Sequence, residues 1–254
     1  MKRITALAIF VIFLASLDSF AGDISKATMY FNEGNSSYRN GDYEEAAANY
    51  NRVIETGYES GHVYYNLGNA YFRNGELGES VCAYLKAKRL MPRDADLKSN
   101  LEYAGSFVKG GFLRVQRNPF AAFLTGLAES FSLDRITIFL VISYLVFTAL
   151  LTARILAFRF SRPLRWGVIL SAAALAFFVL LFSLRLYEVT SVERGVVVAE
   201  NVNARFEPAE EATTFFKLNE GESVIIEKEE KGWLKIKLPD GKLGWVREEK
   251  LSRI

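Results

Sequence analysis

Two long apolar runs constrain the fold of this chain more than any other feature of its sequence. Residues 136–153 and residues 166–184 carry no charged side chain, and each is close to the roughly 20 residues that an α-helix needs to cross a bilayer. The two runs therefore predict transmembrane helices over residues 133–158 and 166–187. The alternative is a pair of buried helices in a soluble core, but nothing else in the chain is large enough to surround them.

The segment between the two runs sets the predicted orientation. It carries four arginines and no acidic residue, and short loops with such a bias stay in the cytoplasm. Residues 159–165 are therefore predicted to form a cytoplasmic Arg-rich loop, and by parity the chain on either side of the two helices lies outside the cytoplasm. The four arginines are Arg154, Arg159, Arg162 and Arg165.

The N-terminal residues give the same orientation independently. A basic start precedes an uncharged apolar stretch over residues 4–17, and small residues follow at Ser19 and Ala21. This order is typical of a secretory signal peptide over residues 1–21, with an uncleaved anchor as the alternative. In both cases the basic end stays inside and the next segment is exported. The expected location is the bacterial inner membrane, with the flanking domains in the periplasm and the short loop in the cytoplasm.

Composition narrows the function further. The 31 basic and 29 acidic residues nearly cancel, so the net charge of +2 gives no reason to expect nucleic acid as a partner. The single cysteine, Cys82, and the single histidine, His62, rule out an intramolecular disulfide and leave little material for a metal cluster or a catalytic dyad. Cys82 is expected to be a buried structural thiol. We expect no enzyme, no cofactor and no metal site.

The exported segment over residues 22–104 contains an internal repeat with a period of 34 residues. Gly34 and Asn35 recur as Gly68 and Asn69. A period of this length is typical of stacked helix pairs. Two copies and a final helix are few for a solenoid, so the membrane-proximal segment is a candidate to complete the core.

The second copy resembles a tetratricopeptide repeat. Gly68 would let two helices approach, with Tyr84 filling the gap between them. Gly75 would break the chain for the turn, and Pro92 would end the second helix. Asp94 is predicted to cap a further helix, over residues 95–104, that covers the open end of the stack. The residues at the family's spacings are Tyr64, Leu67, Gly68, Tyr71, Tyr84, Ala87 and Pro92.

In that family the first helix of each repeat lines a groove, and the stripe that faces it is the same in both copies here. Asn35 and Arg39 lie one helical turn apart, as do Asn69 and Arg73. An Asn can bond the backbone of an extended peptide while an Arg binds a carboxylate, which resembles the two-carboxylate clamp of some tetratricopeptide proteins. The alternative is that both Asn residues bind only a neighbouring helix or water. The predicted groove residues are Asn35, Tyr38, Arg39, Tyr65, Asn69, Phe72 and Arg73.

Residues 105–132 join the repeats to the first transmembrane helix. Asn118 and Pro119 are typical of a helix start, and the apolar residues that follow recur at one-face spacing with only Glu129 charged. The pattern predicts an amphipathic linker helix lying on the outer membrane surface. Packing against the repeats as one more solenoid helix is the alternative.

The C-terminal part of the chain changes from a helical to a period-two pattern. Residues 196–199, 223–227 and 233–238 are apolar or alternating and rich in β-branched side chains, which predicts short strands. A hairpin turn is predicted at Asp240 and Gly241.

Four motifs in residues 190–254 resemble those of bacterial SH3-like domains, in the same order, and imply a small all-β barrel. Trp233 and Trp245 are candidates for a ligand-facing aromatic patch on its surface, and a core role for at least one of them is the alternative. The motifs are residues 202–205, 215–218 with 220–221, 232–236 and 240–246.

The order of modules resembles the E-type Bat proteins of the Bacteroides aerotolerance operon. The resemblance is carried by residues 65–71, 75–78 and 92–97 together with the SH3-like motifs. The first repeat copy departs from the family pattern at two positions. Tyr58 stands where the second copy has a proline, and Glu33 replaces an apolar residue. The fold class is therefore expected to be a multidomain membrane protein with an α-helical tetratricopeptide solenoid, two transmembrane helices and a C-terminal all-β SH3-like barrel.

This resemblance also implies a function. It implies an inner-membrane protein that acts beside von Willebrand A-type membrane proteins and, indirectly, a MoxR-type ATPase in oxygen or envelope stress. We expect a non-enzymatic scaffold or adaptor whose two exported modules bind protein partners. The alternative is a cell-wall anchor or sensor whose SH3-like domain binds peptidoglycan.

Overall fold

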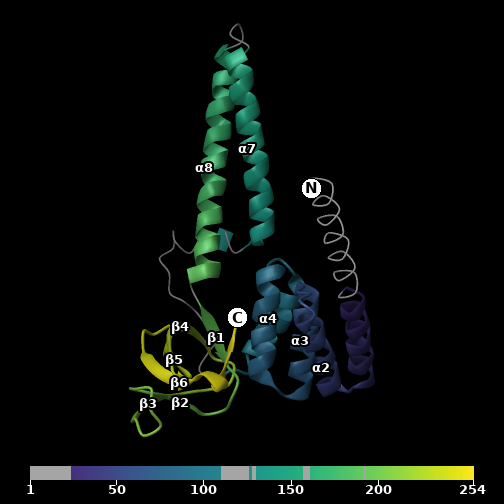
Figure 1. Cartoon of the computed structure of the whole chain (residues 1–254), viewed down its shortest axis with the longest axis vertical. Helices are drawn as coiled ribbons and strands as arrows, with labels where there is room; N and C mark the ends of the chain where they lie inside the picture. The colour runs from purple at the N-terminus through teal and green to yellow at the C-terminus, as the bar shows by residue number, and fades with distance from the viewer. Residues whose placement is uncertain (1–23, 110–125, 128–129, 157–160, 192) are drawn as a thin grey trace, which may run out of the picture.

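The computed structural model consists of a helical domain, a long helical hairpin and a sheet domain (Figure 1). The predicted signal peptide and the predicted helix start at Asn118 lie outside the residues that the structure describes. The described residues are 24–109, 126–127, 130–156, 161–191 and 193–254.

The helical domain contains the predicted pairs of helices. Residues 24–40 are helical and precede α2, α3, α4 and α5. Neighbouring helices pack along the series, α2 on α3, α3 on α4 and α4 on α5. Asp94 caps α5 as predicted, because its Oδ1 accepts a hydrogen bond of 2.8 Å from the backbone N–H of Leu97. The bounds are Tyr43–Glu55 for α2, Gly61–Asn74 for α3, Leu77–Leu90 for α4 and Ala95–Gly105 for α5.

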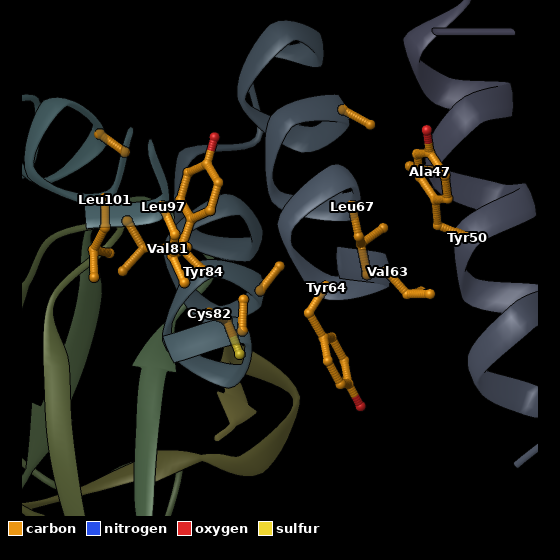
Figure 2. Packing of buried hydrophobic residues seen from close by; sticks show 14 of the residues in the cluster. Ala47, Tyr50, Val63, Tyr64, Leu67, Val81, Cys82, Tyr84, Leu97 and Leu101 are labelled. Atoms are coloured by element: carbon orange, nitrogen blue, oxygen red, sulfur yellow. The ribbon is translucent and has the colours of Figure 1, made fainter. Parts of the chain in front are cut away.

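The repeat buries one tyrosine in each copy against a glycine of the facing helix. A Cβ added to Gly68 would lie 2.6 Å from Cδ1 of Tyr84, and one added to Gly34 would lie 2.8 Å from Cε1 of Tyr50. The glycines therefore set the close helix approach that the 34-residue period predicts. Figure 2 shows Tyr50 and Tyr84 within the row of apolar side chains that forms this core.

Helices α7 (Leu133–Leu156) and α8 (Ser161–Ser191) pack side by side as an extended hairpin (Figure 1). By length and composition both can cross a membrane, with mean hydropathies of 2.3 over Leu133–Leu156 and 2.5 over Leu164–Tyr187. Only 11% and 17% of the residues in their most apolar windows are buried, which argues against the alternative of two soluble-core helices.

The boundary between loop and second helix differs from the prediction. Helix α8 begins at Ser161, so residues 161–165 of the predicted Arg-rich loop are helical. Pro163 lies in the first turn of α8, where a backbone N–H has no partner within the helix, so the proline does not interrupt it. Residues 157–160 lie outside the described part of the chain.

The sheet domain is a single antiparallel sheet in the order β3-β2-β6-β5-β4-β1-β7. The predicted strands correspond to β1, β4 and β5, and the Asp240 and Gly241 turn joins β5 to β6 with Gly241 at φ +90°. The alternation did not reveal β7. The bounds are Arg194–Val197 for β1, Val202–Arg205 for β2, Thr214–Leu218 for β3, Ser223–Glu230 for β4, Trp233–Lys237 for β5, Leu243–Arg247 for β6 and Leu251–Arg253 for β7.

The sheet domain packs directly against the helical domain, a contact that the sequence did not indicate. Strands β1 and β7 lie against α4, and Val196 is buried in the same apolar cluster as the repeat core. Glu220 Oε1 accepts a hydrogen bond of 2.8 Å from the backbone N–H of Gly78, and Ser252 Oγ donates to Glu79 at 2.9 Å. The two domains therefore lie at the same end of the α7 and α8 hairpin, as Figure 1 shows.

Candidate binding groove

The first helices of the repeats bring the predicted groove residues of both copies together. Asn35 and Asn69 line one open pocket of about 220 Å³ with Tyr38 and Arg39. The same pocket is lined by Tyr50 from α2 and by Asn66 from α3. The structure thus assembles four of the seven predicted residues around one concavity.

An amide ladder crosses the floor of this groove. Asn66 Nδ2 donates to Asn35 Oδ1 at 3.2 Å, and one repeat further on Asn100 Nδ2 donates to Asn69 Oδ1 at 2.8 Å. The buried tyrosines complete it, because the hydroxyl of Tyr50 donates to Asn35 Oδ1 at 2.8 Å and Tyr84 bonds Asn69 in the same way at 2.7 Å. The alternative interpretation, that these amides bind neighbouring helices, is therefore correct for their oxygen atoms.

The tyrosines of the ladder remain donors across the physiological pH range. Burial raises the pKa of Tyr50 to about 12 and raises the pKa of Tyr84 as well. Both hydroxyls stay protonated at neutral pH and donate to the Oδ1 atoms of Asn35 and Asn69, so each amide turns its oxygen toward the tyrosine.

The nitrogen atoms of the same amides are left for a ligand. Among the described residues, neither Asn35 Nδ2 nor Asn69 Nδ2 makes a hydrogen bond, although both residues line the pocket. Each amide thus offers N–H donors beside the concavity, two per NH₂ group. The groove can bind carbonyl or carboxylate oxygens through these atoms.

Arg73 is positioned by an aromatic side chain of α2. Its Nη2 donates to the Tyr43 hydroxyl at 2.6 Å, and its guanidinium carbon lies 4.8 Å from the centre of the Tyr43 ring. The ring of Tyr38 contacts Tyr43 edge-on at 5.3 Å. Within the described part of the chain, Arg39 and Arg73 form no ion pair, so both cations are available to a carboxylate.

The remaining two predicted residues have other surroundings. Tyr65 belongs to the ladder, because its hydroxyl accepts a hydrogen bond of 3.0 Å from Asn100 Nδ2. Phe72 contacts Tyr103 and Phe107. Asn66 and Asn100 were not among the predicted residues, although their recurrence at the 34-residue period was a signal that could have identified them.

The expectation of two surface tryptophans in the sheet domain is wrong for Trp233. Trp233 is 4% exposed, and the guanidinium of Arg247 covers its ring at 4.5 Å. Strand alternation placed it on the lysine-bearing face, but an arginine from β6 closes that face over the ring. Trp245 is half-buried, with Lys228 Nζ 5.8 Å from its ring centre.

The aromatic rings that the sheet domain exposes are two phenylalanines. Phe206 is 57% exposed and Phe215 is 45% exposed, and their ring centres lie 4.4 Å apart. Phe215 lies within one of the SH3-like motifs and Phe206 directly follows another, but neither was predicted as a surface site.

Cys82 is buried, as predicted for a structural thiol. Its Sγ lies 3.6 Å from the carbonyl oxygen of Arg253 in β7, and burial raises its pKa to about 11. In the described residues no group of three His, Cys, Asp or Glu side chains is arranged to hold a metal ion.

Two known families match parts of the chain. A tetratricopeptide repeat family matches residues 31–95, and a bacterial SH3 domain family matches residues 200–252. No curated protein sequence matches the chain. The family matches confirm the repeats and the SH3-like domain that the motifs predicted, and both are modules of kinds that bind proteins or peptidoglycan.

Proposed function

We propose that this chain is a non-enzymatic membrane scaffold that binds an extended segment of a partner protein in the groove of its tetratricopeptide repeats. The observation that carries the proposal is the pair of amides, Asn35 and Asn69, whose oxygens are held by the ladder while their nitrogens make no hydrogen bond among the described residues. These donors stand beside two arginines without acidic partners there, Arg39 and Arg73.

This arrangement is suited to an extended peptide that carries a carboxylate. An extended chain presents carbonyl oxygens along a line, so donors that recur from one repeat to the next can bind it at more than one point. A guanidinium and a carboxylate form charge-assisted hydrogen bonds, which are about twice as strong as neutral ones. The ladder holds the amides before binding, which lowers the entropy lost on association.

The predicted membrane helices would tether the two binding modules of the scaffold to one patch of membrane. Helices α7 and α8 are long and apolar enough to cross a bilayer, and both binding modules lie at one end of them. Tethering two modules at one membrane patch raises the local concentration of a partner once another is held. We place that end in the periplasm of the bacterial inner membrane, on the strength of the arginines between the two helices.

For the partners we propose von Willebrand A-type membrane proteins of the Bat type, with a MoxR-type ATPase acting indirectly, in a complex serving aerotolerance or envelope stress. The support is the order of modules along the chain, which resembles the E-type Bat proteins. The repeat and SH3 family matches are consistent with this order.

The test uses substitutions that remove the ligand donors without removing the ladder. In Asn69→Asp the carboxylate keeps an acceptor for Tyr84 and Asn100 but has no N–H to donate, whereas Asn69→Ala would leave both donors without a partner. We expect Asn69→Asp combined with Arg73→Gln to fold as the native protein and to recover at least tenfold less von Willebrand A-type protein in a mild-detergent pull-down.

A matched control is Asn201→Asp, which changes an exposed asparagine of the sheet domain in the same chemical way. Asn201 has φ 53°, a conformation that aspartate also tolerates. Its recovery of partner should equal that of the native chain. Equal recovery by the groove variant, with an unchanged melting curve, would contradict the proposal.

A second candidate function is peptidoglycan binding by the SH3-like domain. It is favoured by the exposed pair Phe206 and Phe215, since carbohydrate sites commonly use exposed aromatic faces, and by the bacterial SH3 match. Sedimentation of the full chain with purified peptidoglycan tests it. Retention that is lost in Phe206→Ser with Phe215→Ser but not in Tyr58→Ser, together with no recovered protein partner, would make this the better function.

A further inference from the structure

The residues that line the groove change from polar to aromatic where the groove reaches α5. At the 34-residue spacing, the place of Asn35 and Asn69 is taken in α5 by Tyr103, and the place of Arg39 and Arg73 is taken just after α5 by Phe107. Polar donors and cations are thus replaced by aromatic rings at one end only.

These two rings form an aromatic cluster with Phe72 of α3. The ring centres lie 5.5 Å apart for Phe72 and Tyr103, 5.7 Å for Phe72 and Phe107, and 5.2 Å for Tyr103 and Phe107. All three pairs are tilted or edge-on. In contacts of this kind the edge of one ring meets the face of another, which holds the rings in defined orientations.

The aromatic cluster is open to solvent in spite of these contacts. Tyr103 is 60% exposed and Phe107 is 52% exposed. Contiguous exposed apolar surface, when it is large, is typical of interaction sites. The cluster borders the groove, because Phe72 lies three positions after Asn69, on the same face of α3, and packs on both rings.

We propose that the aromatic cluster selects the ligand of the groove, by binding a bulky apolar side chain of the same extended segment whose carboxylate is held by Arg73. This inference rests on the proposed function and names the class of its ligand, a segment with one acidic and one large apolar residue. Facing helices pack about 8–10 Å apart, and an extended chain rises about 3.3 Å per residue. The acidic and the apolar residue of the ligand therefore stand roughly three positions apart in its sequence.

The charges around the aromatic cluster match a ligand of this kind. Arg73 directly follows Phe72 on α3, and Lys109, two positions after Phe107, is exposed. Glu102, the acidic neighbour of Tyr103 on α5, pairs with Lys98 at 3.9 Å. The cationic surroundings favour an acidic segment over a basic one.

The same observations argue against a lipid surface as the occupant. The face that carries the aromatic cluster also carries Arg73 and the Asn69 amide, whose nitrogen makes no hydrogen bond among the described residues. Hydrocarbon would leave that N–H without a partner at a cost of several kcal/mol. A peptide supplies carbonyl oxygens at the same place.

The experiment measures binding of fluorescent synthetic decapeptides to the full chain in nanodiscs. The probe peptides have a Gly and Ser backbone with one Glu and one Phe three positions apart, in both orders. The reference peptides replace the Phe by Ser or the Glu by Gln. We expect the peptide with both residues, in one of the two orders, to bind at least tenfold more tightly than either reference.

Three variants separate the contribution of the aromatic cluster from that of Arg73. Tyr103→Ser with Phe107→Ser should abolish the preference for Phe and keep the preference for Glu. Arg73→Gln should abolish the preference for Glu and keep the preference for Phe. Tyr58→Ser changes an aromatic residue that is 48% exposed outside the groove and should change neither. Circular dichroism checks that each variant is folded, and Phe107→Ser alone is the milder variant if the double one is not.

The outcomes distinguish the two proposals. Arg73-dependent binding that is indifferent to the Phe of the peptide would overturn the role of the aromatic cluster and leave the groove function standing. No binding of any probe would overturn both. A benzoylphenylalanine placed at position 107 should crosslink to the added peptide, and crosslinking to nanodisc lipid instead would show that the aromatic cluster faces the membrane.

Discussion

At the scale of single residues, the glycine and tyrosine pairs decide how the groove is built. Gly68 allows the ring of Tyr84 to lie against α3, and that position brings the Tyr84 hydroxyl within 2.7 Å of Asn69 Oδ1. A packing contact thereby orients the amide that is proposed to bind a ligand. The first copy repeats the arrangement with Gly34 and Tyr50.

We therefore predict that Gly68→Ala destabilises the helical domain although alanine is the better helix former. The added Cβ would meet Cδ1 of Tyr84 at 2.6 Å, so the ring must move from the position in which its hydroxyl bonds Asn69. Overpacking of this kind costs about 1–3 kcal/mol, which over most of that range is more than the roughly 1 kcal/mol that alanine gains over glycine in a helix. Thermal unfolding followed by circular dichroism measures the change.

Gly167→Ala in α8 is the matched control, because its nearest neighbour would be Leu150 Cδ1 at 3.6 Å, an ordinary contact. It should leave the melting temperature of the helical domain unchanged. A Gly68→Ala protein as stable as the native chain would show that Tyr84 can be moved at little cost.

At the scale of secondary-structure elements, α4 depends on the sheet domain for its first turn. Its N-cap residue, Glu76, makes no side-chain cap hydrogen bond, and the N–H of Gly78 is satisfied by Glu220 from the loop between β3 and β4. A carboxylate at this position also interacts favourably with the helix dipole. One end of a repeat helix is thus completed by a distant part of the chain.

The prediction is that Glu220→Ala frays the first turn of α4. Loss of a capping acceptor costs about 0.5–2 kcal/mol. Hydrogen exchange of the amides at the start of α4 should become faster by roughly the corresponding factor, about 2- to 30-fold. Glu211→Ala, at an exposed position of the sheet domain, is the control and should exchange as the native chain does. Unaltered exchange at Gly78 in the Glu220 variant would refute the capping role.

At the scale of the whole molecule, the contact between the two domains bears on whether they lie on the same side of a membrane. The chain enters the α7 and α8 hairpin from the helical domain and leaves it into the sheet domain, and these domains pack on each other through α4, β1 and β7. Two domains in contact lie on one side of a membrane. The number of predicted membrane crossings and the contact between the domains thus both place the two domains on the same side.

We predict that alkaline phosphatase fused after Ile254 is active and that the same enzyme fused at Arg162 is inactive, because the phosphatase folds only when exported. Immunoblots should show both fusions at similar levels, and a fluorescent protein that folds in the cytoplasm should give the opposite pattern. An active fusion at Arg162 would reverse the proposed orientation.

Much of the architecture could be predicted from the sequence because it rests on local periodicity. The 34-residue recurrence of Gly34 and Gly68, the uncharged runs of α7 and α8, and the Asp94 cap of α5 are each encoded within a short stretch of chain. The groove stripe was also predictable in part, because residues one helical turn apart share a face.

Only the tertiary structure decided which of these side chains are available. It engaged the oxygen of Asn69 in a bond to Asn100, covered Trp233 with Arg247, and joined Gly78 to Glu220 across 142 positions of sequence. The physical reason is that hydrogen bonding and burial depend on which distant segments meet, and a periodic pattern reports a face of an element but not what lies against it. The sequence by itself determined the elements and their faces, and packing determined which faces remain for a ligand.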